Sequence, residues 1–255
     1  MTSTTTRSSA TTSSTDRSAG GTRDRGTRDR STSATAADVP SPRRAPSRAM
    51  AVAGGVALVA GPLLWGAGMF TSPQQDSMAD ADYISSLVRD TTMTQVSALF
   101  LHYGNLVIAL GILAGPSLVR GTRGLRLAVA GALATAIGFG NVSGMVLSDW
   151  WNASAGTHLT SEQAVEVFRG FKTGSLLPFW DGTEPLSLLG PLLLLAGLAR
   201  AGVLGWWTMA LIVGGVAGLM VFGATSPLVA AACVLVGFSP FALVGLRLLQ
   251  RSRLA

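Results

Sequence analysis

Charged residues are scarce in this chain of 255 residues: they make up 13% of it, whereas hydrophobic residues make up 48%. A soluble domain carries about 25% charged residues, so the composition excludes an ordinary soluble domain and favours a protein embedded in lipid. Aromatic residues are few and glycines are many, 31 in all. This is typical of transmembrane helices that pack closely through small residues.

Cysteine and histidine are almost absent. The single cysteine, Cys233, excludes an internal disulfide and a metal site built from several cysteines. The two histidines do not supply the paired ligands of a membrane haem, because His158 falls in a predicted loop outside the bilayer and only His102 falls in a span. The chain also lacks a metal-spaced cluster, a nucleophile beside a base, and a cofactor fingerprint. We therefore expect no cofactor and no enzyme activity.

The positive charge is concentrated in the first 48 residues. Nine Arg and four Asp there account for +5 of the formal net charge of +6. The same segment holds 21 Ser or Thr residues and the tandem repeat GTRDRGTRDR, and such a composition buries too little surface to offset its ordering entropy. We predict that residues 1–48 form a disordered cytoplasmic tail. The sequence pI near 10.9 therefore does not indicate nucleic-acid binding by the folded part.

Six apolar segments follow the tail. A span needs about 20 apolar residues to cross a hydrocarbon core of roughly 30 Å. The fourth segment is the shortest, because only fifteen uncharged residues separate Glu184 from Arg200. A cleaved signal peptide is the less favoured interpretation of the first segment, whose apolar run is longer than a typical signal core of about 7–15 residues. We predict an all-α polytopic membrane domain over residues 49–255, a bundle of six transmembrane helices near 50–70, 98–119, 127–147, 182–199, 203–222 and 227–247.

The charges between these segments alternate in sign. If the N-terminus is inside, every acidic residue after residue 48 falls in an outer segment, and the inner segments carry only arginine. Cytoplasmic loops of membrane proteins are rich in Lys and Arg. The sequence therefore predicts a plasma-membrane protein with both termini in the cytoplasm. The inner arginines are Arg120, Arg123, Arg126, Arg200, Arg247, Arg251 and Arg253.

Two outer segments have helical periodicity of their own. DSMADADYISSLVRD places Ile84, Leu87 and Val88 on one helical face. LTSEQAVEVFRGF opens with Thr160 and Gln163 at the spacing of a capping box. We predict two short amphipathic helices that lie on the outer membrane surface or cap the bundle. The apolar face of the second helix comprises Ala164, Val165, Phe168 and Phe171.

The order of these elements resembles a known type of protein. An acidic amphipathic helix, a span ending in GPSLVRGTRGLRLAVAG and a later span ending in LLAGLARAG are similar to a six-helix family of integral membrane proteins from high-GC Gram-positive bacteria. Members of that family are described as proteins of unknown function. The resemblance covers residues 49–255 and implies a membrane location, without implying an activity.

A group of polar residues is predicted to lie between the second and third spans. The two spans form a hairpin centred on Arg123, so Asn105 and Asn141 lie eighteen residues from its centre and should share one depth, and His102 should be level with Gly144. Small residues of the third span, including Gly131 and Gly138, share a stripe with Asn141. We predict that this stripe faces the second span and that Asn105 and Asn141 are within hydrogen-bonding reach.

Three acidic residues extend this polar group. Asp149 follows the third span, and Asp181 and Glu184 precede the fourth. Aligning the LG pairs at 110–111 and 189–190 places Asp181 opposite His102 and Glu184 opposite Asn105. The alternative is that these acids are ordinary interface residues beside an aromatic belt. The candidate polar seam or pocket therefore comprises His102, Asn105, Asn141, Asp149, Asp181 and Glu184.

Three functions follow in order of preference. The first is a non-catalytic structural, accessory or partner-binding unit, because polar contacts between membrane helices commonly serve packing. The second is a small permease or sensor with an outward-facing polar pocket between the second, third and fourth spans. A membrane enzyme is third, because the residues for it are missing. The expected partners are the lipid bilayer and either another membrane protein or a second copy of the chain. No nucleic acid is expected, and the sequence names no small-molecule ligand.

Overall fold

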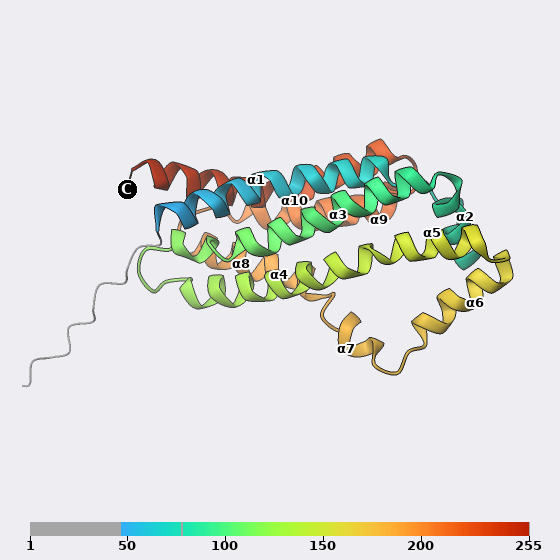
Figure 1. The fold of residues 1–255 in the computed structure, drawn as a ribbon. Helices are drawn as coiled ribbons and strands as arrows, with labels where there is room; N and C mark the ends of the chain where they lie inside the picture. Colours follow the sequence, from blue (N-terminus) through green and yellow to red (C-terminus); the bar gives the residue numbers. More distant parts are fainter. Residues whose placement is uncertain (1–46, 78, 255) are drawn as a thin grey trace, which may run out of the picture. The chain divides into compact units, whose positions relative to one another are not determined.

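The computed structural model describes residues 47–77 and 79–254. This part of the chain is helical and has no strand, which confirms the all-α fold class (Figure 1). The predicted tail lies outside the described residues except for its last two, because Ser47 caps the first helix and Arg48 begins it. The elements are α1 Arg48–Thr71, α2 Asp80–Arg89, α3 Thr91–Ile112, η1 Gly115–Leu118, α4 Leu125–Val146, α5 Ser148–His158, α6 Ser161–Lys172, α7 Leu177–Asp181, α8 Leu186–Arg200, α9 Trp207–Phe222 and α10 Pro227–Arg253.

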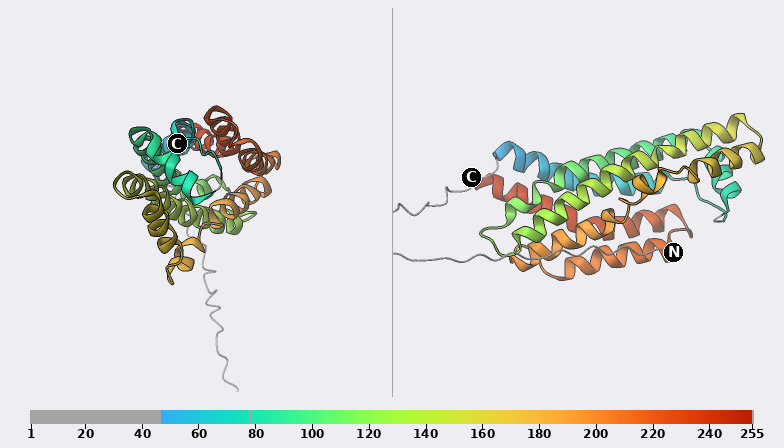
Figure 2. Two further views of the ribbon diagram at one scale, coloured as in Figure 1. Left: turned by 90° about the vertical axis from the view of Figure 1, so that its right-hand side faces the viewer. Right: turned by 90° about the horizontal axis from the view of Figure 1, so that it is seen from below.

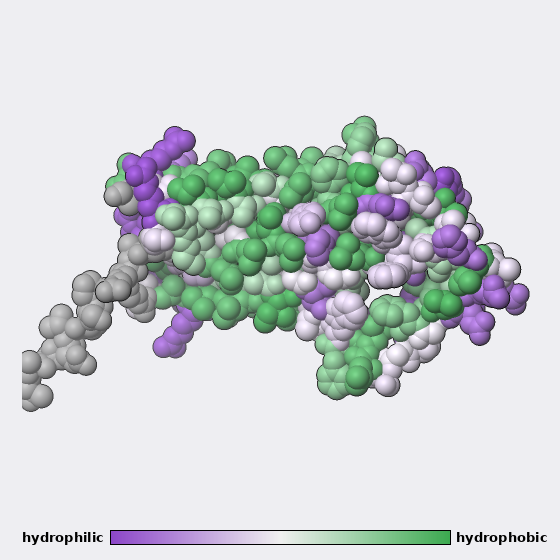
Figure 3. Space-filling view, viewed as in Figure 1, coloured by the Kyte–Doolittle hydropathy of each residue, from purple (hydrophilic) through white to green (hydrophobic). Residues whose placement is uncertain are grey.

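Five helical stretches of the described chain are long and apolar enough to cross a membrane, which supports a membrane-embedded protein. Hydrophobic side chains cover much of the bundle's side, and the most hydrophilic ones gather toward its two ends (Figure 3). Helix α9 is also apolar, but its 16 residues span only about 24 Å at 1.5 Å per residue. The five stretches are Arg48–Thr71, Thr91–Leu118, Leu125–His158, Leu177–Arg200 and Pro227–Arg253.

The hairpin of α3 and α4 is longer than predicted. Helix α3 begins at Thr91 instead of near residue 98, because the Asp90 carboxylate caps it by accepting a hydrogen bond of 2.9 Å from the Met93 amide. Helix α5 continues almost directly from α4 and ends at His158. His102 therefore lies three turns inside α3.

Glycines lie at the contacts between helices and allow the helices to approach closely. Helix α1 lies between α3 and α10, α4 packs against α8 and α3, and α9 packs mainly against α10 (Figures 1 and 2). On α1, a Cβ at Gly61 or Gly68 would overlap side chains of α3. On α4, a Cβ at Gly131 or Gly138 would overlap the backbone of α8 at Leu194 and Ser187. The predicted small-residue stripe of the third span therefore faces α8, and our prediction that it faces the second span is wrong.

The two short amphipathic helices form where the sequence predicts them. In α2, Ile84 and Leu87 are buried, and Ile84 packs beside Gly156 of α5. Helix α6 begins with the predicted capping box: the Gln163 amide donates to Thr160 Oγ1 at 3.3 Å, and the Thr160 amide donates to Gln163 Oε1 at 3.1 Å. Only part of the predicted apolar face of α6 is covered, because Ala164 is buried and Phe171 remains exposed.

Candidate functional site

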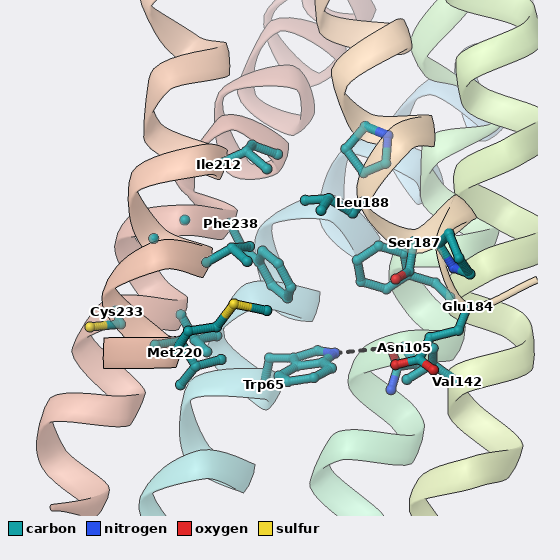
Figure 4. Close-up of a pocket in the computed structure, with 18 of the residues that line it drawn as sticks. Trp65, Asn105, Val142, Glu184, Ser187, Leu188, Ile212, Met220, Cys233 and Phe238 are labelled. Carbon is teal, nitrogen blue, oxygen red and sulfur yellow. Dashed lines mark hydrogen bonds between the residues drawn. The ribbon is translucent and has the colours of Figure 1, made fainter. Parts of the chain in front are cut away.

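A cavity of about 470 Å³ lies within the bundle, between α1, α3, α4, α8, α9 and α10 (Figure 4). Its walls are mainly apolar side chains, and its polar groups are few. The apolar wall includes Trp65, Phe139, Leu188, Ile212, Met220 and Phe238, and the polar groups are Asn105, Asp181, Glu184 and Ser187. Three of the six predicted site residues therefore line one cavity.

Asn105 is fully buried, and both ends of its amide are used. Its Oδ1 accepts a hydrogen bond of 3.1 Å from the Trp65 indole N–H, and its Nδ2 donates to the Leu101 carbonyl at 2.8 Å. The bond to Trp65 crosses from α3 to α1 and fixes the indole at the cavity wall (Figure 4). Asn105 therefore positions Trp65 and does not pair with Asn141, so that sequence prediction is wrong.

Aromatic rings build one wall of the cavity. The Trp65 ring meets Phe238 edge to face, with centroids 5.3 Å apart, and Phe238 in turn contacts Phe139 at 5.5 Å. Sequence reasoning missed all three rings. One signal was present for Trp65, since a buried indole N–H normally needs a hydrogen-bond partner, and Asn105 offers one on the next span. No comparable signal identifies the two phenylalanines.

Asp181 and Glu184 lie at the mouth of the cavity. Asp181 ends α7 and is partly buried, whereas Glu184 lies in the turn before α8 and is exposed. Leu188 and Met220 also line the cavity and are exposed, so the mouth opens between α8 and α9. Within residues 47–77 and 79–254, neither carboxylate forms a hydrogen bond through its side chain or an ion pair.

Asn141 supports this mouth from α4. Its Nδ2 donates a hydrogen bond of 2.8 Å to the carbonyl of Trp180, the residue before Asp181. The bond ties α7 to α4 and so holds Asp181 at the cavity. Asn141 itself does not line the cavity.

His102 joins α3 to α4 outside the cavity. Its Nδ1 lies 2.8 Å from Ser143 Oγ and 2.9 Å from the Ser143 carbonyl oxygen. Ser143 is adjacent to Gly144, so the hairpin count located the partner of His102 to within one residue. The ring lies on a separate surface groove that Tyr103, Trp150 and Trp151 also line. These bonds make His102 a packing contact between two helices.

Asp149 belongs to a third location, where α2, α5 and α6 meet. Its carboxylate accepts a hydrogen bond from the hydroxyl of Tyr83, and that hydroxyl also accepts one of 3.2 Å from Asn152 Nδ2. The Tyr83 ring lies 5.0 Å from the ring of Phe168. Burial, and secondly the Asp149 carboxylate, raise the pKa of Tyr83 well above its usual value. Tyr83 therefore stays protonated and holds α2 on α5.

This raised pKa predicts a loss of stability at high pH. Because the pKa of Tyr83 is higher in the folded protein than in the unfolded chain, its contribution is fully present below about pH 10 and decreases as the pH rises further. Thermal unfolding in detergent, followed from about pH 8 to pH 11.5, should show a melting temperature that falls above pH 10.

The Tyr83→Phe variant isolates this effect, because it keeps every other titratable group. Its melting temperature should depend less steeply on pH above pH 10. The difference in phenolate absorbance between the wild type and the variant reports the ionisation of Tyr83. As the pH rises, this difference should stay constant until the wild type unfolds. A phenolate signal from Tyr83 that appears in the folded protein near pH 10 would contradict this assignment.

The described residues contain no group of three or more His, Cys, Asp or Glu side chains that could hold a metal ion. No family model matches the chain, and no curated protein or solved structure matches it either.

Proposed function

We propose that this protein crosses a bacterial plasma membrane six times and binds a largely apolar organic cation in the central cavity. The observation that carries the proposal is an apolar, aromatic-walled cavity with the two carboxylates of Asp181 and Glu184 at its mouth. The protein is then a binding protein, such as a small permease or sensor, and not an enzyme.

The size and lining of the cavity support a small-molecule ligand. Ligand pockets commonly have volumes of about 300–1,000 Å³, with mostly hydrophobic walls and a few polar groups that fix orientation. The volume of about 470 Å³ lies in this range. The helices leave this space unfilled, whereas well-packed protein interiors have few voids larger than a water molecule.

The charges support a cation. Asp181 is partly buried and so loses part of its hydration, and both carboxylates are stabilised when a positive charge lies beside them. No Lys or Arg of the described residues lines the cavity. The rings of Trp65 and Phe238 add a second source of attraction, because a cation within about 6 Å of a ring face is stabilised by the ring quadrupole.

The six-span topology is supported by the charge pattern and by the length of the uncharged segment that contains α9. The apolar segment that contains α9 runs without a charge from residue 201 to residue 246, long enough for two spans of about 20 residues. With six spans, both termini are cytoplasmic, α2 and α6 lie outside, and Asp181 and Glu184 are near the outer headgroups. The cavity mouth then opens sideways between α8 and α9, where an amphipathic cation dissolved in the outer leaflet enters. The resemblance to the uncharacterised six-helix family is part of this proposal.

A second function is supported by a different observation. The contacts of His102 with Ser143 and of Asn141 with Trp180 are hydrogen bonds that connect helices within the bundle. These contacts favour a structural or accessory unit that holds a membrane partner or a second copy. Ligand binding separates the two functions, because an accessory unit needs no cation.

The test is binding of tetraphenylphosphonium to the purified full-length protein in detergent, measured by equilibrium dialysis. The tetraphenylborate anion, which has nearly the same shape but the opposite charge, is the control ligand. We expect the cation to bind and the anion to bind at least tenfold more weakly, which corresponds to about 1.4 kcal/mol. Equal binding of the two ions, or no binding of the cation, would overturn the proposal.

The Asp181→Asn/Glu184→Gln variant should lose this preference. Its affinity for tetraphenylphosphonium should fall at least tenfold, because the two carboxylates supply the attraction for the cation. A matched control is Glu162→Gln/Glu166→Gln, which removes two exposed carboxylates of α6 that do not line the cavity. If the control loses as much affinity as the cavity variant, the attraction comes from the surface as a whole and not from the site.

A further inference from the structure

A second pocket, formed by the ends of three helical elements, carries a different charge. It has a volume of about 400 Å³ and lies where η1 ends, where α8 turns toward α9, and where α10 ends. These elements meet at the end of the bundle where the described chain finishes (Figure 1). The lining residues that the argument uses are Leu118, Arg120, Val203, Arg247, Arg251 and Leu254.

Three guanidinium groups surround this pocket, and no counter-charge lies beside them among residues 47–77 and 79–254. Arg120, Arg247 and Arg251 line it, and none of the lining residues that the structure describes is acidic. None of the three forms an ion pair within the part of the chain that the structure describes. Three cations around one hollow repel each other, so an anion bound between them would be stabilised by all three.

Arg251 is held in place by the chain itself. Its Nη1 donates a hydrogen bond to the Ser117 carbonyl in η1. Beside this carbonyl, the Ser117 hydroxyl is buried without a hydrogen-bond partner among the described residues. The bond fixes one guanidinium at the pocket, whereas Arg120 and Arg247 are exposed and free to close on a ligand. Guanidinium groups bind phosphate in a bidentate fashion, which a fixed fork favours.

Apart from Gln250, the other described lining residues are apolar. Leu118 and Val203 form part of the wall, and Leu254 is 89% exposed at the rim. A fully hydrated ion would gain no stabilisation from contact with these apolar side chains. A phosphate attached to a glycerol and acyl chains would place its charge among the arginines and its apolar part against these side chains.

We propose that this pocket binds the phosphate of an anionic phospholipid headgroup. The chemistry recognised is a phosphate diester that has acyl chains on one side and no cationic group on the other, and basic pockets between membrane helices are suited to such anionic headgroups. The site is separate from the cation cavity, shares no lining residue with it, and does not depend on the cation-binding function. With both termini inside, the lipid is taken from the cytoplasmic leaflet.

Native mass spectrometry of the full-length protein in detergent tests this site. The ligands are phosphatidylglycerol and phosphatidylcholine with the same acyl chains, together with glycerol phosphate and inorganic phosphate. We expect phosphatidylglycerol to bind at least tenfold more tightly than each of the other three. Equal binding of phosphatidylcholine would overturn the role of the charge, and equal binding of a soluble phosphate would overturn the lipid as the ligand.

The variant is Arg120→Gln/Arg247→Gln, which leaves Arg251 and its bond to Ser117 intact. It should lose at least tenfold in affinity for phosphatidylglycerol. The control Arg123→Gln/Arg253→Gln removes the same charge from two exposed residues near this end that do not line the pocket, and it should lose less than threefold. Equal losses in the two variants would overturn the pocket as the site.

Photocrosslinking tests the same site in the wild-type protein, so its result does not depend on whether the double variant folds. Phosphatidylglycerol with a photoreactive group near the glycerol should crosslink to the segment around Gln250–Leu254 of the wild type. Crosslinks found mainly in α2 or α6 would place the lipid elsewhere and overturn the proposal.

Discussion

The Gly131→Leu variant should unfold in detergent at a temperature about 10 °C lower than the wild type. Gly131 lies at a close contact between α4 and α8, and even a Cβ there would overlap the backbone nitrogen and Cα of Leu194. This overlap can be relieved only if the two helices move apart, because backbone atoms, unlike a side chain, cannot adopt another rotamer. Overpacking of this kind costs about 3 kcal/mol, and about 3 kcal/mol shifts the melting temperature of a protein of this size by roughly 6–12 °C.

The matched control is Gly140→Leu on the same helix. A Cβ at Gly140 meets no heavy atom within 4 Å, and leucine is a better helix former than glycine by up to about 1 kcal/mol. We therefore expect Gly140→Leu to melt at the wild-type temperature or slightly above it. Similar losses for the two variants would show that α4 does not meet α8 through Gly131.

Because α8 carries Leu188 and follows Glu184, the Gly131→Leu variant should also disturb the cation cavity. Separation of α4 from α8 moves one wall away from Trp65 and Phe238, which belong to other helices. We expect its binding of tetraphenylphosphonium to fall with its stability, whereas Gly140→Leu should bind the cation as the wild type does.

The second large effect is expected at Asn105. Replacing it with leucine removes the only hydrogen-bond partner that the structure gives to the Trp65 indole N–H among the described residues. An unsatisfied buried donor costs about 1–3 kcal/mol. We expect the Asn105→Leu variant to be destabilised by about 2 kcal/mol and to lose most of its affinity for tetraphenylphosphonium, because the indole is no longer fixed at the cavity wall.

A double-mutant cycle with Trp65→Phe separates this bond from the loss of packing. Phenylalanine has no N–H, so Asn105→Leu should cost less in the Trp65→Phe background than in the wild type. We expect a coupling of about 0.5–1.5 kcal/mol, the range for one hydrogen bond between membrane helices. Strictly additive losses, measured by thermal unfolding of all four proteins, would show that the two side chains do not interact.

The sequence located the helices and the depth of residues on the α3–α4 hairpin better than it located the neighbours of each helix. Hydropathy identified each apolar helix, and the Thr160–Gln163 spacing identified a capping box that forms as predicted. Counting residues from the centre of the hairpin predicted that His102 is level with Gly144, and its actual partner is the neighbouring residue, Ser143. These features depend on helix rise, chain connectivity and local hydrogen bonding, all of which are properties of a short stretch of sequence.

The faces of the helices were predicted less well. Gly131 and Gly138 contact α8, although we expected the second span. Asn105 bonds to Trp65, which we had not considered, and Asn141 bonds to the backbone of α7. The six predicted site residues are divided among the cavity, the α3–α4 contact, the α4–α7 contact and the junction of α2 with α5, because neighbours in depth on a hairpin need not share a face.

The sequence by itself therefore determined that this chain forms apolar helices and in which order they follow. It also determined that acidic and basic charges alternate between them. Only the tertiary structure decided which helical faces meet, that Trp65 and Asn105 form one wall of a cavity, and that three arginines surround a pocket. The physical reason is the solvent: in lipid an apolar face gains little by turning inward, so hydrophobic periodicity does not report a helix's neighbours. The neighbours are chosen by the fit of glycines against backbone and by individual polar contacts.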